Sequence, residues 1–422
     1  MIVEVGGRPV HVGPRAAWDA AKVEVAAQSR PLRLWLGLLT VLCLIGAVGA
    51  VLAIAPGWEV FGTTPTVEWG LLIIAYVFFA VTTSGLCLAS SLGTVFGIEM
   101  FTPLEKRHAV LAVLSLVTAF GIIALDLHFP LRLMFGMVLS PSPTSPMWWM
   151  GVLYGIYLCF LLTEVWSMFT GRYQVHQVAC VLASIMAILA PTTLGAVFGV
   201  LVARSYWFGA FTPPSMLVAA LMSGTALLGI VFYCVVRFQL RGHQRAAALA
   251  IPAIRLLMTI VILVSVFLTV VQVIGGLYGN VPGVADATLS YLLGPLALPF
   301  WILRVILGLL VPLALLLLPR TRTPAGVFAA SCLAFMGLFV DRVVFVLAGQ
   351  IAPTTASSGV VSDPWATYVP SFVEVSITVG GIAFIALAYT LAERFLDMGE
   401  HGGHVGFFRL KAPTYHAAGD EH

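Results

Sequence analysis

The sequence predicts an all-α polytopic membrane protein with ten transmembrane helices. Hydrophobic residues make up 60% of the 422 residues and charged residues only 9%, a composition that is too apolar for a water-soluble domain. The mean hydropathy of +1.03 agrees with this reading. Ten long apolar stretches divide the chain, and each is long enough to cross a hydrocarbon core about 30 Å thick, which takes about 20 helical residues.

The first half of the chain holds five of these stretches. A polar, mixed segment at residues 1–32 precedes the first one, which is long enough to be a true span and is not a cleavable signal peptide. Residues 99–108 and 171–177 form short connections, and Pro191 predicts a kink in the fifth helix. The five predicted helices lie near residues 33–55, 69–97, 109–127, 147–169 and 178–203.

The second half holds the other five stretches, which complete a membrane domain at residues 33–395, and it ends in a polar tail at 396–422. Pro252 predicts a kink in the seventh helix. Three longer connections, at 127–146, 278–294 and 348–368, are rich in Pro, Gly, Ser and Thr, and we expect a partner to dock on the face that carries them. The five predicted helices lie near residues 215–238, 250–274, 295–318, 325–347 and 370–392.

The distribution of positive charge predicts the orientation. If the N-terminus is cytoplasmic and the helices alternate, all but four of the 21 Lys and Arg residues fall on the cytoplasmic side, as the positive-inside rule requires. Both termini are then cytoplasmic, because ten is even. The net charge of +3 is largely this topological excess, so it predicts no nucleic-acid partner. The four exceptions lie near the outer ends of their helices and need another explanation: Arg132, Arg204, Arg304 and Arg342.

Cysteines and histidines predict no redox cofactor within this chain. The six cysteines are single and lie inside predicted helices, whereas an iron–sulfur cluster or a zinc site needs clustered thiolates. A membrane haem needs facing histidines, yet all nine histidines except His128 fall in predicted cytoplasmic segments or tails. His108 and His176 share the cytoplasmic interface, but one histidine at the start of each of two helices is a poor haem signature. We therefore expect no haem, iron–sulfur cluster or metal in this chain.

Polar and ionisable residues inside the predicted helices are the strongest functional signal, because a charge in hydrocarbon is costly. Most of them gather in the outer half of the membrane. Internal salt bridges, such as Asp126–Arg132 or Asp341–Arg304, are the structural alternative. The inner half is sparser, with Glu164 inside the fourth helix and Glu99 at the end of the second. The outer set comprises Asp126, His128, Arg132, Arg204, Gln272, Arg304, Asp341, Arg342 and Glu374.

Several stretches resemble a known family. Residues 69–97, WGLLIIAYVFFAVTTSGLCLASSLGTVFG, together with TPLEKRHAVLA and GIIALDLHFPLR, look like the membrane subunit of polysulfide-reductase-type complexes, the NrfD/PsrC superfamily. The resemblance continues through the fourth helix in SPTSPMWWMGVLYGIYLCFLLTEVW. The C-terminal YVPSFVEVSITVGGIAF, with its P-S-x-x-E core, is similar to the ten-helix branch. That branch includes membrane subunits of hydrogenase-2, alternative complex III and the quinone reductase complex.

The resemblance implies a quinone-interacting subunit of a respiratory complex in the cytoplasmic (inner) membrane of a bacterium or archaeon. Menaquinone or ubiquinone would bind near the outer (periplasmic) face, where an iron–sulfur ferredoxin-like subunit docks. Molybdopterin, hydrogenase or cytochrome c subunits would lie beyond it, and membrane lipid would surround the chain. The resemblance also implies two four-helix bundles, about 69–203 and 215–347, with the first and last helices peripheral. Whether protons are translocated stays open.

The family motif at the end of the third helix implies that Asp126 and His128 contact the quinone, with Arg132 beside them. The family often has a Gly-Arg-Pro-like turn after the aspartate, whereas this chain reads LHFP, which leaves the role of His128 open. The other outer polar residues would support this site. Glu164 matches an acidic position on the fourth helix and predicts a proton route, to which we add Glu99.

The chemistry of quinone reduction agrees with these residue types. It takes two electrons and two protons, and a histidine with a pKa near 6.5 exchanges protons at working pH. Two other classes stay open. A secondary transporter also has about ten helices and buried charges, although those gather near the midplane. A purely structural membrane anchor is the third class, but it would need no buried charge.

Overall fold

The protein is described by a computed structural model over residues 2–5, 8–11, 30–54, 60–127, 140–237, 244–279, 281, 283–352 and 365–396. Within these ranges, ten helices are long and apolar enough to cross a membrane, which confirms the predicted all-α polytopic fold class. A small antiparallel hairpin lies outside that prediction. Its strands are β1 (Ile2–Val5) and β2 (Arg8–His11).

The ten helices follow the predicted apolar stretches to within a few residues at most boundaries. The predicted kink residues Pro191 and Pro252 lie inside the fifth and seventh of them. The bounds are α2 (Arg30–Ile54), α3 (Leu71–Thr94), α4 (Glu105–Asp126), α6 (Pro146–Thr170), α7 (Tyr173–Gly199), α8 (Thr212–Arg237), α9 (Gln244–Tyr278), η3 (Pro299–Leu310) continuing as α11 (Val311–Leu317), α12 (Pro324–Ile351) and α13 (Phe372–Phe395).

Two local features were not predicted. The helix α10 (Val284–Leu292) occupies most of the expected 278–294 loop. The span η3 is a π-helix, at whose end the Val311 N–H donates to the Ile306 carbonyl, five residues back. Such turns are rare and occur often at functional sites. Two short 3₁₀ segments, η2 (Glu99–Leu104) and η4 (Pro319–Thr321), complete the described elements.

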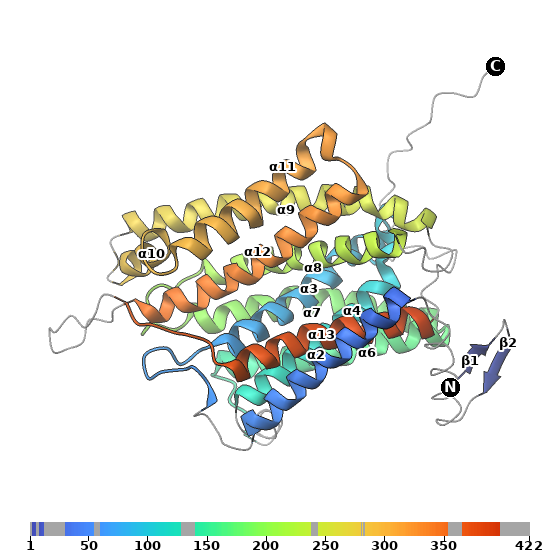
Figure 1. The fold of residues 1–422 in the computed structure, drawn as a ribbon, viewed down its shortest axis with the longest axis horizontal. Helices are drawn as coiled ribbons and strands as arrows, with labels where there is room; N and C mark the ends of the chain where they lie inside the picture. The colour runs from blue at the N-terminus through green and yellow to red at the C-terminus, as the bar shows by residue number, and fades with distance from the viewer. Residues whose placement is uncertain are drawn as a thin grey trace.

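The long helices lie side by side along the longest axis of the molecule (Figure 1). The central helix is α3. In its most apolar segment 83% of the residues are buried, whereas in that of α2 only 22% are. A first group is formed by α3, α4, α6 and α7, and a second by α8, α9, η3 and α12. The two groups meet mainly where α3 and α7 pack against α8, and the pair α2–α13 packs on α4 at the edge.

Small residues allow the two groups to approach closely. A Cβ atom on Gly85 of α3 would lie 1.6 Å from the Ala220 carbonyl oxygen of α8, and one on Gly224 would lie 2.0 Å from the Gly85 carbonyl carbon. No larger side chain fits at either position. This is the close backbone contact by which small residues drive helix association in membranes.

The molecule has two ends, which long-range contacts define. At the terminal end, where α2 begins and α13 ends, Arg107 at the start of α4 donates to Glu393 of α13 at 2.8 Å. We call the opposite end, where α3 begins and α12 ends, the loop end. There the Trp69 N–H, just before α3, donates to Gln350, near the end of α12, at 2.8 Å. These contacts fit helices that alternate in direction along the chain.

Candidate functional site

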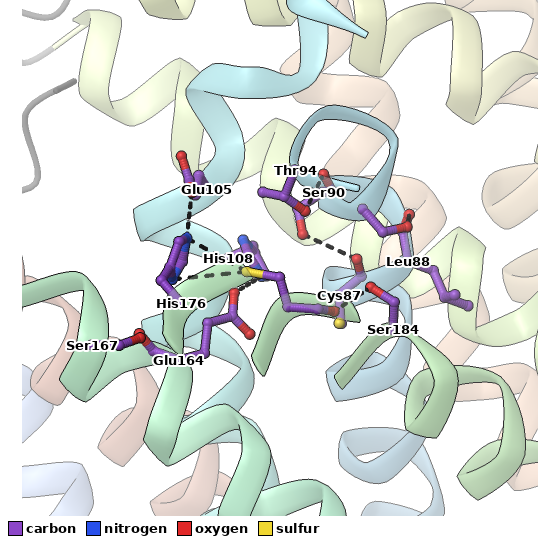
Figure 2. Close-up of polar contacts among 12 residues, drawn as sticks. Cys87, Leu88, Ser90, Thr94, Glu105, His108, Glu164, Ser167, His176 and Ser184 are labelled. Atoms are coloured by element: carbon purple, nitrogen blue, oxygen red, sulfur yellow. Dashed lines mark hydrogen bonds and ion pairs between the residues drawn. The ribbon is translucent and has the colours of Figure 1, made fainter. Parts of the chain in front are cut away.

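A group of four ionisable side chains, three buried and one half-buried, lies in the first helix group near the terminal end. We call it the histidine–glutamate cluster, and Figure 2 shows its members converging from three helices. Two come from the first turn of α4, one from α6 and one from the first turn of α7. The members are Glu105, His108, Glu164 and His176.

Two contacts hold the cluster together. The His108 Nε2 atom lies 3.1 Å from Oε1 of Glu164, and both side chains are 1% exposed. The His176 Nε2 atom lies 2.5 Å from Oε1 of Glu105. The second carboxylate oxygen of Glu164, Oε2, is buried without a hydrogen-bond partner in the described part of the chain. Glu164 thus has one oxygen beside the imidazole of His108 and one that no described group satisfies.

A row of buried polar side chains continues from the cluster toward the loop end. Cys87 lies beside it on α3 (Figure 2). Further along, the Tyr157 hydroxyl donates to the Thr83 carbonyl at 3.3 Å, and the hydroxyls of Ser84 and Tyr154 are buried without a partner among the described residues. The row Cys87, Tyr157, Ser84 and Tyr154 thus gives the first helix group a polar interior between its two ends.

The other inner residue from the sequence, Glu99, is exposed on η2. It therefore lies at the surface of the terminal end, outside the buried cluster. The Arg107–Glu393 pair is a second buried contact at this end, and the Tyr389 hydroxyl also donates to Glu393 at 2.9 Å. This pair ties α4 to α13.

Asp126 is the last residue of α4 and lies half-buried at the loop end. Its carboxylate interacts electrostatically with that of Glu374, and it makes no hydrogen bond to any other described residue. His128 and Arg132, the other two predicted quinone contacts, lie outside the described residues. The structure therefore gives the position of one of the three.

Glu374 proves to organise the loop end. Its Oε2 atom accepts from the backbone N–H groups of Gly62 and Ser371, each at 2.8 Å. Its Oε1 atom accepts from the Tyr368 hydroxyl at 2.7 Å and from the Leu71 N–H at 3.2 Å. Ser371 and Glu374 form a capping box at the start of α13, so the P-S-x-x-E motif is a helix-capping motif. The carboxylate joins the N-termini of α3 and α13.

Arg204 has a similar connecting role. Its guanidinium donates to the carbonyls of Gln350 at 3.2 Å and Thr66 at 3.3 Å. The Gln350 side-chain amide in turn accepts a hydrogen bond from the Trp69 N–H and donates one to the Trp69 carbonyl. The Trp69 indole stacks on that of Trp207, with ring centroids 5.0 Å apart. This arrangement joins α12 to the segment before α3.

The remaining predicted residues line a cavity of about 50 Å³ in the second helix group, which we call the arginine cavity. Asp341 pairs with Nε of Arg304 and, through its other oxygen, with Arg342, whose Nε lies 3.1 Å away. The predicted Asp341–Arg304 salt bridge is thus present. The Gln272 amide donates to the Tyr206 hydroxyl at 2.9 Å. The described members of the outer polar set therefore divide among three places and do not form one cluster.

Three of the residues that matter here were not predicted in these roles. His108 and His176 were considered only as haem ligands, although an imidazole at the start of a helix can equally pair with a carboxylate. Gln350 was overlooked because it lies beyond the predicted end of its helix. No group of three or more His, Cys, Asp or Glu side chains that could hold a metal ion occurs in the described parts of the chain.

The described parts of the chain contain ten apolar helices and paired charges in their interior, which define a multi-pass integral membrane protein. Comparison with known protein families identifies the family. Residues 59–354 match the model of the family described as polysulphide reductase, NrfD. The chain belongs to the NrfD family, and the resemblance predicted from its motifs is confirmed.

Curated relatives match nearly the full chain. It is 23% identical over 413 residues to a selenate reductase subunit of Mesobacillus selenatarsenatis. The matched region covers 87% of this chain and 94% of that relative. It is 28% identical over 403 residues to a putative dimethyl sulfoxide reductase membrane subunit of Halobacterium salinarum, with 86% and 91% covered. It is 26% identical over 356 residues to the Hdr-like menaquinol oxidoreductase integral membrane subunit of Archaeoglobus fulgidus, with 80% and 86% covered.

Proposed function

We propose that this chain is the membrane subunit through which a respiratory oxidoreductase complex exchanges electrons with quinone or quinol. Membership of the NrfD family, whose subunits interact with quinone, supports the proposal. One relative carries menaquinol in its name, so menaquinone is the first quinone to test and ubiquinone the second. The names of the relatives also favour a reductase as the catalytic partner.

In this proposal the terminal end faces the cytoplasm and the loop end faces outward. The Lys and Arg residues support it, because the positive-inside rule places an excess of them on the cytoplasmic side. An iron–sulfur subunit would dock on the loop end, within electron-transfer range of the quinone. The described positive residues at the terminal end include Arg30, Arg33, Lys106, Arg107, Arg172, Arg237, Arg245, Arg255, Arg320, Arg322 and Arg394.

We place the quinone head group beside Asp126. Both oxygens of Glu374 are occupied by donors that hold the fold together. Asp126 is its half-buried neighbour and has no such partner among the described residues. Its oxygens are therefore free to accept a hydrogen bond from a quinol hydroxyl. His128 follows two residues later and is the second proposed contact, with Arg132 beside it.

The single observation that carries a proton-coupled role is the buried His108–Glu164 pair with its unpartnered Glu164 oxygen. Quinone chemistry moves two protons with two electrons, so a site at the loop end needs a proton path. An imidazole–carboxylate pair can pass protons, and the polar row of Cys87, Tyr157, Ser84 and Tyr154 leads from it toward the loop end. We propose that this row connects the cytoplasm with the quinone.

Binding of a quinone-site inhibitor to the purified complex tests the proposal. We expect saturable binding that is competed by menaquinone analogues, together with loss of quinone-coupled turnover. Activity of the catalytic partner with an artificial electron carrier should persist, because such carriers bypass this subunit. A complex that binds no inhibitor and turns over no quinone would instead support the anchor or transporter reading.

A further inference from the structure

The arginine cavity contains more hydrogen-bond donors than acceptors. The Nη1 atom of Arg304 has no acceptor among the described residues, while its Nε and Nη2 atoms bond Asp341 and Thr269. The Nη1 atom of Arg342 meets only the Met216 sulfur, which is a weak acceptor. Two guanidinium nitrogens therefore have no oxygen acceptor among the described residues.

Two tyrosine hydroxyls add to this excess. Tyr291 is buried, lines the cavity and has no hydrogen-bond partner among the described residues. Tyr206 accepts from Gln272 at 2.9 Å, which leaves its own hydrogen to be donated. Burial raises the pKa of both tyrosines, so both hydroxyls stay protonated, and the two hydroxyls also interact with each other.

Most side-chain acceptors of the described lining are already used, and the amide oxygen of Gln272 remains as an acceptor. Both oxygens of Asp341 bond arginines. The Thr269 hydroxyl accepts from Arg304 at 3.1 Å and donates to the Ser265 carbonyl at 2.8 Å. The Ser265 hydroxyl likewise donates to a carbonyl of its own helix, that of Val261.

The net charge of the described cavity lining also favours an anion. Among the described residues that line the cavity, two arginines face one carboxylate, Asp341, so one positive charge lacks a partner. An uncompensated buried charge is strongly unfavourable, and more so in a membrane. The volume of about 50 Å³ exceeds the space that one water needs, but it is small for a quinone ring.

From this donor excess and unbalanced charge we infer that the arginine cavity binds one small inorganic anion of the halide class. The anion would accept from Nη1 of Arg304 and from the hydroxyls of Tyr206 and Tyr291, and it would neutralise the second guanidinium. It would also hold η3 against α12, where a Cβ on Gly308 would lie 2.6 Å from the Gly337 Cα. The site is separate from the proposed quinone site.

Chloride binding to the purified, detergent-solubilised complex tests the inference. Equilibrium dialysis with radiolabelled chloride, against gluconate at constant ionic strength, should show one more saturable site per complex in the wild type than in Arg304→Gln. That variant makes the described lining neutral while keeping the hydrogen bonds that an amide can make. Arg204→Gln is the matched control, because its guanidinium bonds carbonyls outside the cavity, and it should keep the site.

A measurement on the wild type covers the case in which the variant does not fold. Crystals of the complex grown with bromide should give an anomalous peak among Arg304, Tyr206 and Tyr291. Absence of that peak, or equal chloride binding by the wild type and a folded Arg304→Gln complex, would overturn the inference and leave water as the occupant. Neither result bears on quinone turnover, so failure here is distinguishable from failure of the proposed function.

Discussion

The Nε2 atom of His108 lies 3.1 Å from Oε1 of Glu164 in the interior of the first helix group. The contact joins the first turn of α4 to the last turns of α6. Both side chains are almost fully removed from solvent, and the second Glu164 oxygen is unpartnered in the described structure. An ionised pair that served only to hold the helices would be expected to satisfy both oxygens. The unpartnered oxygen is the observation that supports the proposed proton route.

Glu164→Gln should slow quinone-coupled turnover by about one to two orders of magnitude, because an amide keeps the shape and one acceptor but cannot carry a proton. Inhibitor binding at the quinone site should be unchanged. Turnover is measured as steady-state quinone reduction or quinol oxidation by the purified complex. Inhibitor binding is measured by titration.

The matched control for that variant is Glu393→Gln. This carboxylate is also buried at the terminal end, but it pairs with Arg107 outside the polar row. We expect it to lower thermal stability and leave turnover per folded complex near the wild-type value. Normal turnover in Glu164→Gln would remove this residue from the proton route.

Asp126→Asn and His128→Ala should each cut quinone-coupled turnover sharply, by about tenfold or more, since each removes a group that exchanges a proton with the quinone. Assembly should be intact, and activity with an artificial carrier should be unchanged. Turnover of both variants at the wild-type rate would contradict the placement of the site at the end of α4 and would leave the family assignment untouched.

Glu374→Ala should destabilise the subunit by about 3 kcal/mol or more, because the N–H groups of Gly62 and Ser371 and the Tyr368 hydroxyl lose their acceptor. The Leu71 N–H keeps only the Tyr368 hydroxyl as its acceptor. Glu374→Gln keeps one oxygen and should lose less. The unfolding temperature of the complex, or the yield of assembled complex at a series of temperatures, gives the comparison. Equal stability of the wild type and Glu374→Ala would mean that water replaces the carboxylate at all four donors.

Reporter fusions at Arg241 and at Ser357 should report opposite compartments, with Arg241 cytoplasmic. Both positions lie outside the described residues; along the chain the first follows α8 and the second follows α12. Alkaline phosphatase activity marks the outer position and a fluorescent protein the inner one. The same compartment for both fusions would refute the alternation of ten spans.

Much of the fold follows from the sequence, because a transmembrane helix is a local feature. Each needs only about 20 apolar residues, so ten stretches were enough to predict ten spans and most of their boundaries. The π-helix η3 and the helix α10 were not predictable in this way. Residues 299–310 are as apolar as an α-helix requires, and the π-helical hydrogen bonding leaves no pattern in that composition.

The sequence predicted which charged residues lie inside the membrane and at what depth. For most of them it did not predict which groups they bond. The cost of burying charge singled out Asp126, Glu164, Arg304, Asp341 and Glu374 before any helix was placed. The predicted Asp341–Arg304 pair is present. Glu374, however, caps a helix, and Arg204 holds backbone carbonyls. Their positions along the helices were compatible with a shared outer site, and only their partners distinguish these roles.

The sequence by itself determined that this is a ten-helix membrane protein of the NrfD family with costly charges in its interior, because hydropathy, length and motif are read along one chain. Only the tertiary structure decided that His108 meets Glu164 and that two arginines share one aspartate around a cavity. Those contacts depend on how helices distant in the chain rotate and pack. That rotation is set by close contacts such as Gly85 against Gly224, which no single helix contains.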